Sequence, residues 1–198
     1  MSRSSSKTTA QKTILSRRQE EVPVIPDWVS THVFRGQVLR RMHPLPIVKG
    51  ALHAVAELKG HDQILFLILS DLMSNALEHG VLRLETPKGE NLTEGLRYQK
   101  EREKAFESLR YGLVIVELRY VQAGAKHRMI IRVEDSGIGF DHGALNGLMD
   151  PTDALMRAAH GLNVIREICT SITYYGRGNI VEAIYEWDTA PSNEGPDH

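Results

Sequence analysis

The chain has 198 residues and a formal net charge of −1, with 41% hydrophobic and 25% charged residues. These values suit one ordinary globular domain with tails, or one and a half domains. The near-neutral charge excludes a global basic field for nucleic acid, and Cys169, the single cysteine, excludes an internal disulfide and a cysteine-based zinc site. No apolar run reaches the roughly 18 residues of a transmembrane helix, so we expect no membrane association.

The two ends of the chain differ from its middle. Residues 1–26 start with a basic, Ser/Thr-rich stretch that lacks an apolar signal core, so we interpret them as a flexible tail or a linker. Residues 189–198 are rich in Pro, Gly and Asp, and we expect a second flexible tail there. The ordered domain is therefore expected over residues 27–188, and the cysteine usage fits a reducing, cytoplasmic compartment.

The first half of this domain predicts one strand followed by two helices. Residues 29–39 are rich in β-branched and apolar side chains, which is typical of a strand at the edge of a sheet. Apolar residues then recur at helical spacing over 47–59, namely Ile47, Ala51, Val55 and Leu58. The next helix is predicted to start at Asp62 as its N-cap and to end at Gly80.

The second half predicts an insert, four strands and one helix. Residues 81–110 are a charged insert, and we interpret their helix-prone part as a solvated surface helix, with a partner-docking surface as the alternative. The other elements are strands at 111–121, 128–135, 171–175 and 180–187 and a helix at 161–170. This order predicts an α+β fold of two layers: a mostly antiparallel mixed sheet with helices on one face.

The most informative motif is DLMSNALEHG at 71–80, the polar end of an otherwise apolar helix. Asp71 and Asn75 stand four residues apart, about one helical turn, so both side chains leave the same face. A buried amide without a partner costs on the order of 1–3 kcal/mol, so Asn75 needs one. That partner is either a neighbouring backbone group or a ligand.

Two further motifs follow. In VEDSGIGFD at 133–141, strand alternation places the Asp135 carboxylate at the end of an apolar face, where it needs a hydrogen-bond donor. In AHGLNVI at 159–165, Gly161 opens a helix, and the free N–H groups and dipole of a helix start favour phosphate. His79 and His160 stay open between a place at a site and an ordinary structural or exposed one.

In their order and on these elements, the three motifs resemble the ATPase superfamily of gyrase, Hsp90, histidine kinases and MutL, which has the Bergerat fold. The closest likeness is to the anti-sigma-factor serine kinases, and it covers about residues 28–188. The resemblance implies that Asn75 binds Mg²⁺ and that Asp135 accepts a hydrogen bond from the adenine of ATP. It further implies that the two glycine boxes bind the nucleotide, through Gly137 and Gly139 and through Ala159, His160, Gly161 and Leu162. Residues 140–160 would form the nucleotide lid.

In the kinases of this family the position of Asp71, usually a Glu, is taken as the general base. Asp71 is one methylene shorter, and Ala159 stands where a glycine is common. The resemblance implies a serine/threonine kinase that phosphorylates a serine on a small anti-sigma-factor antagonist. It would thereby regulate a sigma factor or similar client by partner switching, as a homodimer or as a domain of a larger bacterial regulator.

The two departures motivate an alternative, a regulatory module that binds nucleotide and protein without phosphotransfer. A histidine-kinase catalytic domain is a weaker third interpretation, because no dimerisation helix with a phosphoacceptor histidine precedes the domain in this chain.

Overall fold

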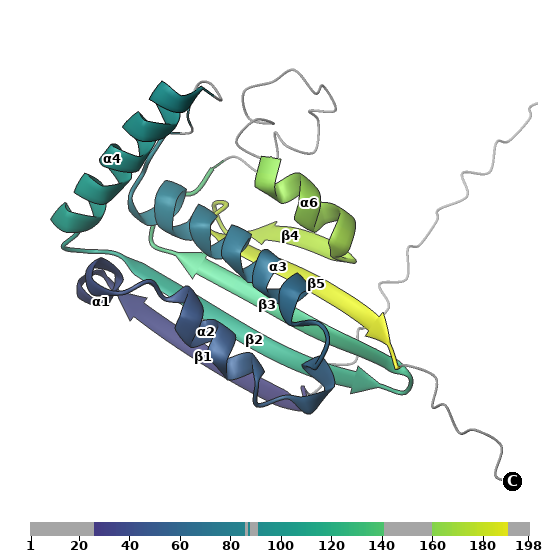
Figure 1. Cartoon of the computed structure of the whole chain (residues 1–198). Coiled ribbons are helices and arrows are strands. Elements are labelled where there is room, and N and C mark those ends of the chain that lie inside the picture. The colour runs from purple at the N-terminus through teal and green to yellow at the C-terminus, as the bar shows by residue number, and fades with distance from the viewer. Residues whose placement is uncertain (1–25, 86, 88–90, 141–159, 190–198) are drawn as a thin grey trace, which may run out of the picture.

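The structure is a computed structural model, and it describes residues 26–85, 87, 91–140 and 160–189. These residues form two layers: a five-stranded sheet and a layer of helices on one of its faces (Figure 1). The strands are β1 (Trp28–Arg35), β2 (Leu113–Ala123), β3 (Lys126–Asp135), β4 (Ser171–Tyr175) and β5 (Ile180–Asp188). Their order in the sheet is β1-β2-β3-β5-β4.

The helices are α1 (Gly36–Arg41), α2 (Leu45–Leu52), α3 (Asp62–Ser74), α4 (Leu92–Ser108) and α6 (His160–Ile168). A 3₁₀ turn, η1 (Ala56–Leu58), precedes α3, and a π-helical segment, η2 (Asn75–Val81), continues it. The α+β class and the single helical layer are confirmed. The expected mixed sheet is corrected, because within the described part of the chain every pair of neighbouring strands is antiparallel.

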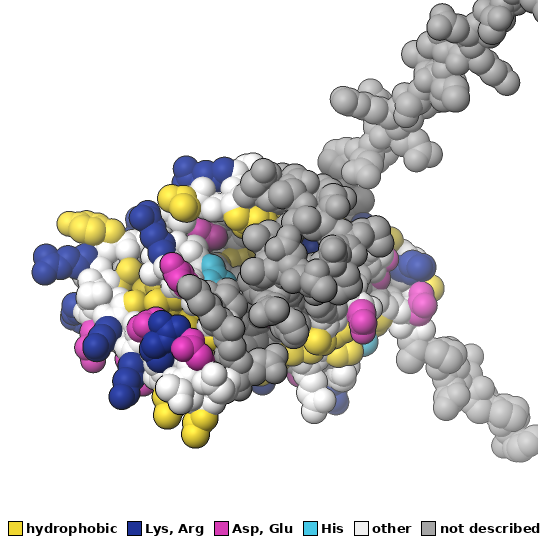
Figure 2. All heavy atoms as spheres, turned by 90° about the horizontal axis from the view of Figure 1, so that it is seen from above, with side chains coloured by type: hydrophobic (Ala, Val, Ile, Leu, Met, Phe, Trp, Pro, Cys, Tyr) yellow, Lys and Arg dark blue, Asp and Glu magenta, His cyan; other side chains and the backbone are white. Residues whose placement is uncertain are grey.

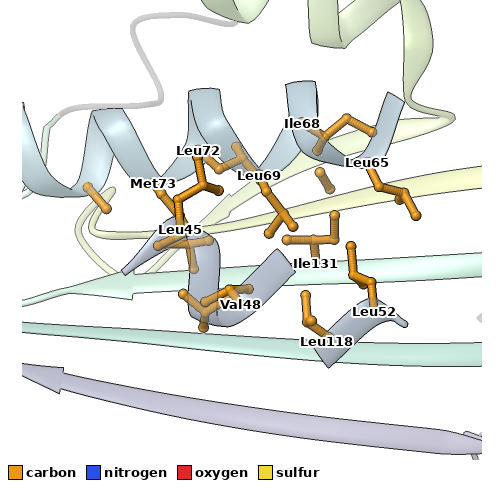
Figure 3. Packing of buried hydrophobic residues seen from close by; sticks show 14 of the residues in the cluster. Leu45, Val48, Leu52, Leu65, Ile68, Leu69, Leu72, Met73, Leu118 and Ile131 are labelled. Atoms are coloured by element: carbon orange, nitrogen blue, oxygen red, sulfur yellow. The ribbon is translucent and has the colours of Figure 1, made fainter. Parts of the chain in front are cut away.

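The core lies between the sheet and helices α2, α3 and α6. Alternation along β3 buries Met129, Ile131 and Val133 on the helix-facing side, as the sequence pattern predicts. Figure 3 shows the side chains of α2 and α3 pointing toward β2 and β3, where they meet Leu118 and Ile131. The strand that ends at Asp135 is therefore fixed by a close-packed core just before its last residue.

The first predicted strand is too long. It ends at Arg35, and residues 36–41 form α1 instead of continuing the sheet. The reason is a close approach: a Cβ on Gly36 would lie 2.8 Å from the carbonyl oxygen of Arg110. Only glycine lets the chain turn here against the segment before β2, and local β propensity gives way to this tertiary contact.

The helix predicted at 47–59 is shorter than expected, and its core-facing side is shifted by about one residue from the predicted one. Helix α2 ends at Leu52, its buried residues include Val48 and Leu52, and Ile47 is 40% exposed. A proline in the first turn, Pro46, suits the start of a helix because its missing N–H is not needed there. In α3, Asp62 is the first helical residue, and the N-cap position belongs to His61.

Helix α3 carries apolar residues on its outer side as well, but it is buried on one side only. Leu65, Ile68 and Leu69 are fully buried, whereas Phe66 and Leu67 face outward. By length and composition alone, Asp62–Val81 could cross a membrane. Its inner side packs in the core, which is the behaviour of a core helix, and a membrane protein is not indicated. Helix α4 has no buried residue, so the expectation of a surface helix in the insert is confirmed.

Candidate functional site

The polar end of α3 carries the first two candidate residues. Asp71 and Asn75 are both half-buried, and the Asn75 Nδ2 donates to Asp71 Oδ2 at 3.4 Å. The helix changes from α to π geometry at Asn75 and stays π-helical through Val81. Single turns of π-helix occur frequently at functional sites because they re-aim side chains. The expected same-face arrangement of Asp71 and Asn75 is therefore present, and the Asn75 carbonyl oxygen is not used in their bond.

Asp71 lies in a partly desolvated place. Burial raises the pKa of its carboxyl group above the usual value. Its charge also acts on Tyr174 of β4: burial is the main cause that raises the pKa of that phenol, Arg166 opposes the rise, and Asp71 adds to it. Tyr174 therefore lies near the candidate base, and Arg166 of α6 acts on the same phenol from its own side. Neither was predicted, since an arginine on a helix and a tyrosine on a strand carry no motif.

The first and second motifs meet at Gly80 and Asp135. A Cβ on Gly80 would overlap the Asp135 carboxyl group, and a Cβ on Gly137 would lie 2.5 Å from the Gly80 carbonyl oxygen. The Gly137 N–H donates to Asp135 Oδ1 at 2.7 Å, so the donor that the strand pattern requires comes from the glycine motif itself. Two glycines thus bring the end of the π-helical segment and the end of β3 into direct contact.

The turn between β4 and β5 forms the other side of the glycine motif. Arg177 Nη2 donates to the Gly137 carbonyl at 2.9 Å, and Asn179 Nδ2 donates to the Asp135 carbonyl at 2.8 Å. The backbone N–H of Asp135 in turn donates to the Asn179 carbonyl at 3.0 Å. Gly139 has φ of 75°, and a Cβ there would overlap the Arg177 carbonyl. Gly176 and Gly178 are typical of a tight turn, but a turn signal does not say what the turn will contact.

The electrostatics of Asp135 follow from these contacts. Burial raises the pKa of its carboxyl group, while the Gly137 hydrogen bond and the Arg177 charge oppose that rise and Glu134 adds to it. One oxygen is held by Gly137, and the second is the acceptor that a ligand with an N–H group needs. Asp135 is therefore a positioned hydrogen-bond acceptor at the end of a rigid strand.

A clamp that was not predicted holds the π-helical segment to the insert. Glu78 accepts from Tyr98 at 2.5 Å and from Arg102 Nε at 2.7 Å, and both donors lie on α4. Burial alone would raise the pKa of Glu78, but these two hydrogen bonds and the Arg102 charge bring it below its usual value. Next to it, exposed His79 is hydrogen-bonded through Nδ1 to the Leu84 carbonyl at 2.8 Å. The surface helix α4 is thus attached at the candidate site.

The second glycine box is described only in part. Ala159 and most of the expected lid, residues 141–159, lie outside the described residues. His160, Gly161 and Leu162 form the first turn of α6, so the helix opens where the sequence predicts. The same helix is anchored by Ile165, which is fully buried in the common core. The first turn of α6 therefore belongs to the same helical layer as Asp71.

The sequence matches no protein-family model and no curated protein. The assignment of this site therefore rests on its residues and geometry. In the described part of the chain these bring Asp71, Asn75, Asp135, Gly137 and Gly139 to one end of the sheet and its covering helix.

Proposed function

We propose that the chain is an ATP-dependent serine/threonine protein kinase of the anti-sigma-factor type. The observation that supports this most is the contact of Gly80 with Asp135, because it joins the motif that resembles the N box to the one that resembles the first glycine box. A single nucleotide site needs both: Asn75 as a metal ligand and Asp135 as the acceptor for the base.

The donor set fits ATP and Mg²⁺. Asp135 accepts from the adenine amino group through the oxygen that Gly137 leaves available. The resemblance assigns Gly137 and Gly139 to the same nucleotide site, and here they let η2 and the β4–β5 turn pack closely on the end of β3. Asn75 offers an amide oxygen, the hard ligand that Mg²⁺ prefers. Mg²⁺ usually keeps several waters and is shared with substrate phosphates, so a single amide oxygen can serve as its protein ligand. Bound ATP supplies the phosphoryl group.

Asp71 takes the role of the general base. Burial raises the pKa of its carboxyl group, which makes it a better proton acceptor than an exposed aspartate. The hydrogen bond from Asn75 fixes its orientation. In this proposal the carboxylate accepts the proton of a serine hydroxyl on a small anti-sigma-factor antagonist. The enzyme works as a cytoplasmic homodimer that switches a sigma factor or anti-sigma factor between partners.

A second candidate function, a module that binds nucleotide and protein without transfer, is favoured by the same pair of residues. The Asp71 side chain is short, and its Oδ2 is already engaged by Asn75 at 3.4 Å. A carboxylate held in this way reaches less far toward a hydroxyl group. The two functions therefore differ only in what Asp71 does.

Nucleotide binding is tested by thermal unfolding with ATP, with and without Mg²⁺. A ligand that binds only the folded state raises the melting temperature, so we expect a rise with ATP and a further rise with Mg²⁺. Asn75→Ala should remove most of the Mg²⁺-dependent part. Gln63→Ala, which removes an exposed amide from the same helix, should leave it unchanged. Absence of any shift with adenine nucleotides would contradict both functions.

Phosphoryl transfer from ATP to a partner is tested with labelled ATP, Mg²⁺ and the partner protein that co-purifies with the chain. The kinase predicts label on a partner serine, lost in Asp71→Asn while the ATP-induced thermal shift is kept. Because Asn carries no charge to bury, this variant should be at least as stable as the parent at neutral pH. Binding without label in the parent would favour the module, and label that survives Asp71→Asn would remove Asp71 as the base.

A further inference from the structure

A cationic hollow lies between α1 and the segment that joins α4 to β2. Its volume is about 320 Å³, and its walls are formed by Gln37, Arg40, Arg41, Leu109, Arg110 and Tyr111. Half of these residues are arginines and none is acidic. Figure 2 shows Lys and Arg side chains at the left of the view, the end where Figure 1 places α1 and α4, with Asp and Glu side chains among them. None of the residues that form this hollow, here named the arginine hollow, belongs to the candidate nucleotide site.

The walls of the arginine hollow are fixed by backbone contacts. The Gly36 N–H donates to the Gly112 carbonyl at 2.9 Å, and a Cβ on Gly36 would lie 2.8 Å from the Arg110 carbonyl oxygen. Helix α1 therefore packs directly on the backbone at 110–112. Arginines from two segments far apart in the sequence are held together by the fold itself, which is the kind of preorganisation that a binding site needs.

The three arginines are exposed. Within the described ranges no carboxylate lies in ion-pair distance of Arg40, Arg41 or Arg110, whereas Arg102 and Arg119 each hold a glutamate. Arg40 and Arg41 lie in the last turn of α1, where the helix dipole favours cations. The dipole therefore explains the presence of these two arginines. It does not account for Arg110, which lies on the opposite wall. Three like charges around one hollow repel one another unless an anion joins them.

A second hollow adjoins the first. It has a volume of about 390 Å³, shares Leu109, Arg110 and Tyr111 with the arginine hollow, and is otherwise lined by Val81, Leu82, Ala105 and Ser108. Its lining is mostly apolar. Tyr111, which is 88% exposed, stands on the wall between the two. A ligand that spans both therefore carries an anionic group next to an apolar one.

We propose that the arginine hollow binds a phosphate monoester. Guanidinium groups match phosphate oxygens with pairs of parallel hydrogen bonds. A phosphate monoester carries nearly two negative charges at neutral pH, which balances a three-arginine cluster better than a single carboxylate does. Its source is either a phosphorylated side chain of a partner protein, with a neighbouring apolar residue in the second hollow, or a small phosphate ester.

The test is an NMR titration of the full chain with three probes: inorganic phosphate, O-phosphoserine and a short peptide with phosphoserine flanked by leucines. We expect amide shifts at Gly36–Arg41 and at 109–112 with every probe. Arg41→Gln and Arg110→Gln should each weaken binding by about tenfold, the loss of one charge-assisted hydrogen-bond pair. Lys126→Gln removes the same charge from an exposed residue of the β2–β3 hairpin and should change the affinity by less than about twofold.

The relative affinities of the probes and variants identify the source of the phosphate group and test the proposal itself. A phosphopeptide that binds more tightly than O-phosphoserine and inorganic phosphate, and more tightly than its unphosphorylated form, identifies a protein segment as the ligand. O-phosphoserine that binds as tightly as the phosphopeptide, and more tightly than inorganic phosphate, identifies a small ester. Equal affinities for all three probes would contradict the recognition of an ester. Arg110→Lys, which keeps the charge but not the planar fork, should bind between the parent and Arg110→Gln. Equal losses in Arg110→Gln and Lys126→Gln, or shifts confined to other residues, would overturn the proposal.

Discussion

Gly80 is the residue at which two separate motifs touch. A side chain at this position would occupy the space of the Asp135 carboxyl group, and Gly137 packs on the Gly80 carbonyl from the other side. Because position 80 has no side chain, the end of the core is closely packed and the Asp135 oxygens are held in place there. A glycine inside a helical segment costs stability, so its presence here is offset by this contact.

This reasoning predicts opposite results for two glycine-to-alanine changes. Gly80→Ala should lower the free energy of unfolding by about 1–3 kcal/mol, the usual cost of overpacking, and should abolish the ATP-induced thermal shift by moving Asp135. Gly95→Ala, on exposed α4 with open space around it, should raise that free energy by about 0.5–1 kcal/mol. Urea unfolding measures both. Equal effects of the two changes would show that the contact with Asp135 is unimportant.

At the scale of elements, α4 is a surface helix whose side-chain hydrogen bonds to the rest of the described domain all go to Glu78. It buries none of its residues, and its main link to the domain is the pairing of Tyr98 and Arg102 with Glu78. Glu78 belongs to η2, between Asn75 and Gly80. A displacement of α4 therefore acts on the same segment that carries the Asn75 amide. The Glu78–Arg102 pair is mostly enclosed, so it contributes more than a surface ion pair does.

Removal of one member of this pair should leave the other without its charge partner. Arg102→Gln is expected to lower the free energy of unfolding by about 1–3 kcal/mol, because Glu78 stays partly buried without its charge partner. Arg97→Gln on the same helix breaks only solvent-screened pairs within the helix and should leave the free energy of unfolding nearly unchanged. Urea unfolding of both variants provides the comparison. A cost for Arg102→Gln no larger than that for Arg97→Gln would argue against the clamp.

At the scale of the whole molecule, the sequence predicts the layers well and the contacts between elements poorly. Alternation in β3 and the glycines after it place Asp135 correctly, because strand period and turn chemistry are local properties. Helix α1 was missed because a tertiary contact of Gly36 overrides local strand propensity. The link of Arg177 to Gly137 and the Glu78 clamp have no local signal at all, since each joins residues far apart in the chain.

The far end of the sheet holds an aromatic cluster that both layers share. The centroid of the Trp187 ring lies 4.6 Å from that of the His61 ring and 5.4 Å from that of the His127 ring. His61 Nδ1 is hydrogen-bonded to the Tyr185 hydroxyl at 2.8 Å, and His127 Nδ1 to that of Tyr120 at 2.7 Å. Because His61 immediately precedes α3, this cluster joins the helical layer to the sheet at the end opposite the candidate site.

The cluster makes stability depend on pH through His61. Burial, and next the charge of His127, lower the pKa of His61 below 6.5, against the opposing charge of Asp62. The unfolded chain then binds a proton more readily, so the free energy of unfolding is highest above about pH 6.5 and falls as the pH drops toward the lower folded-state pKa.

His61→Phe should lower the free energy of unfolding by about 1 kcal/mol at about pH 8, because the variant lacks the bond to Tyr185. On acidification, the free energy of unfolding of this variant should fall less than that of the parent. Urea unfolding from about pH 8 to about pH 5 tests this, with exposed His53→Gln expected to follow the parent. Parallel pH profiles for the parent and His61→Phe would show that His61 does not carry the dependence.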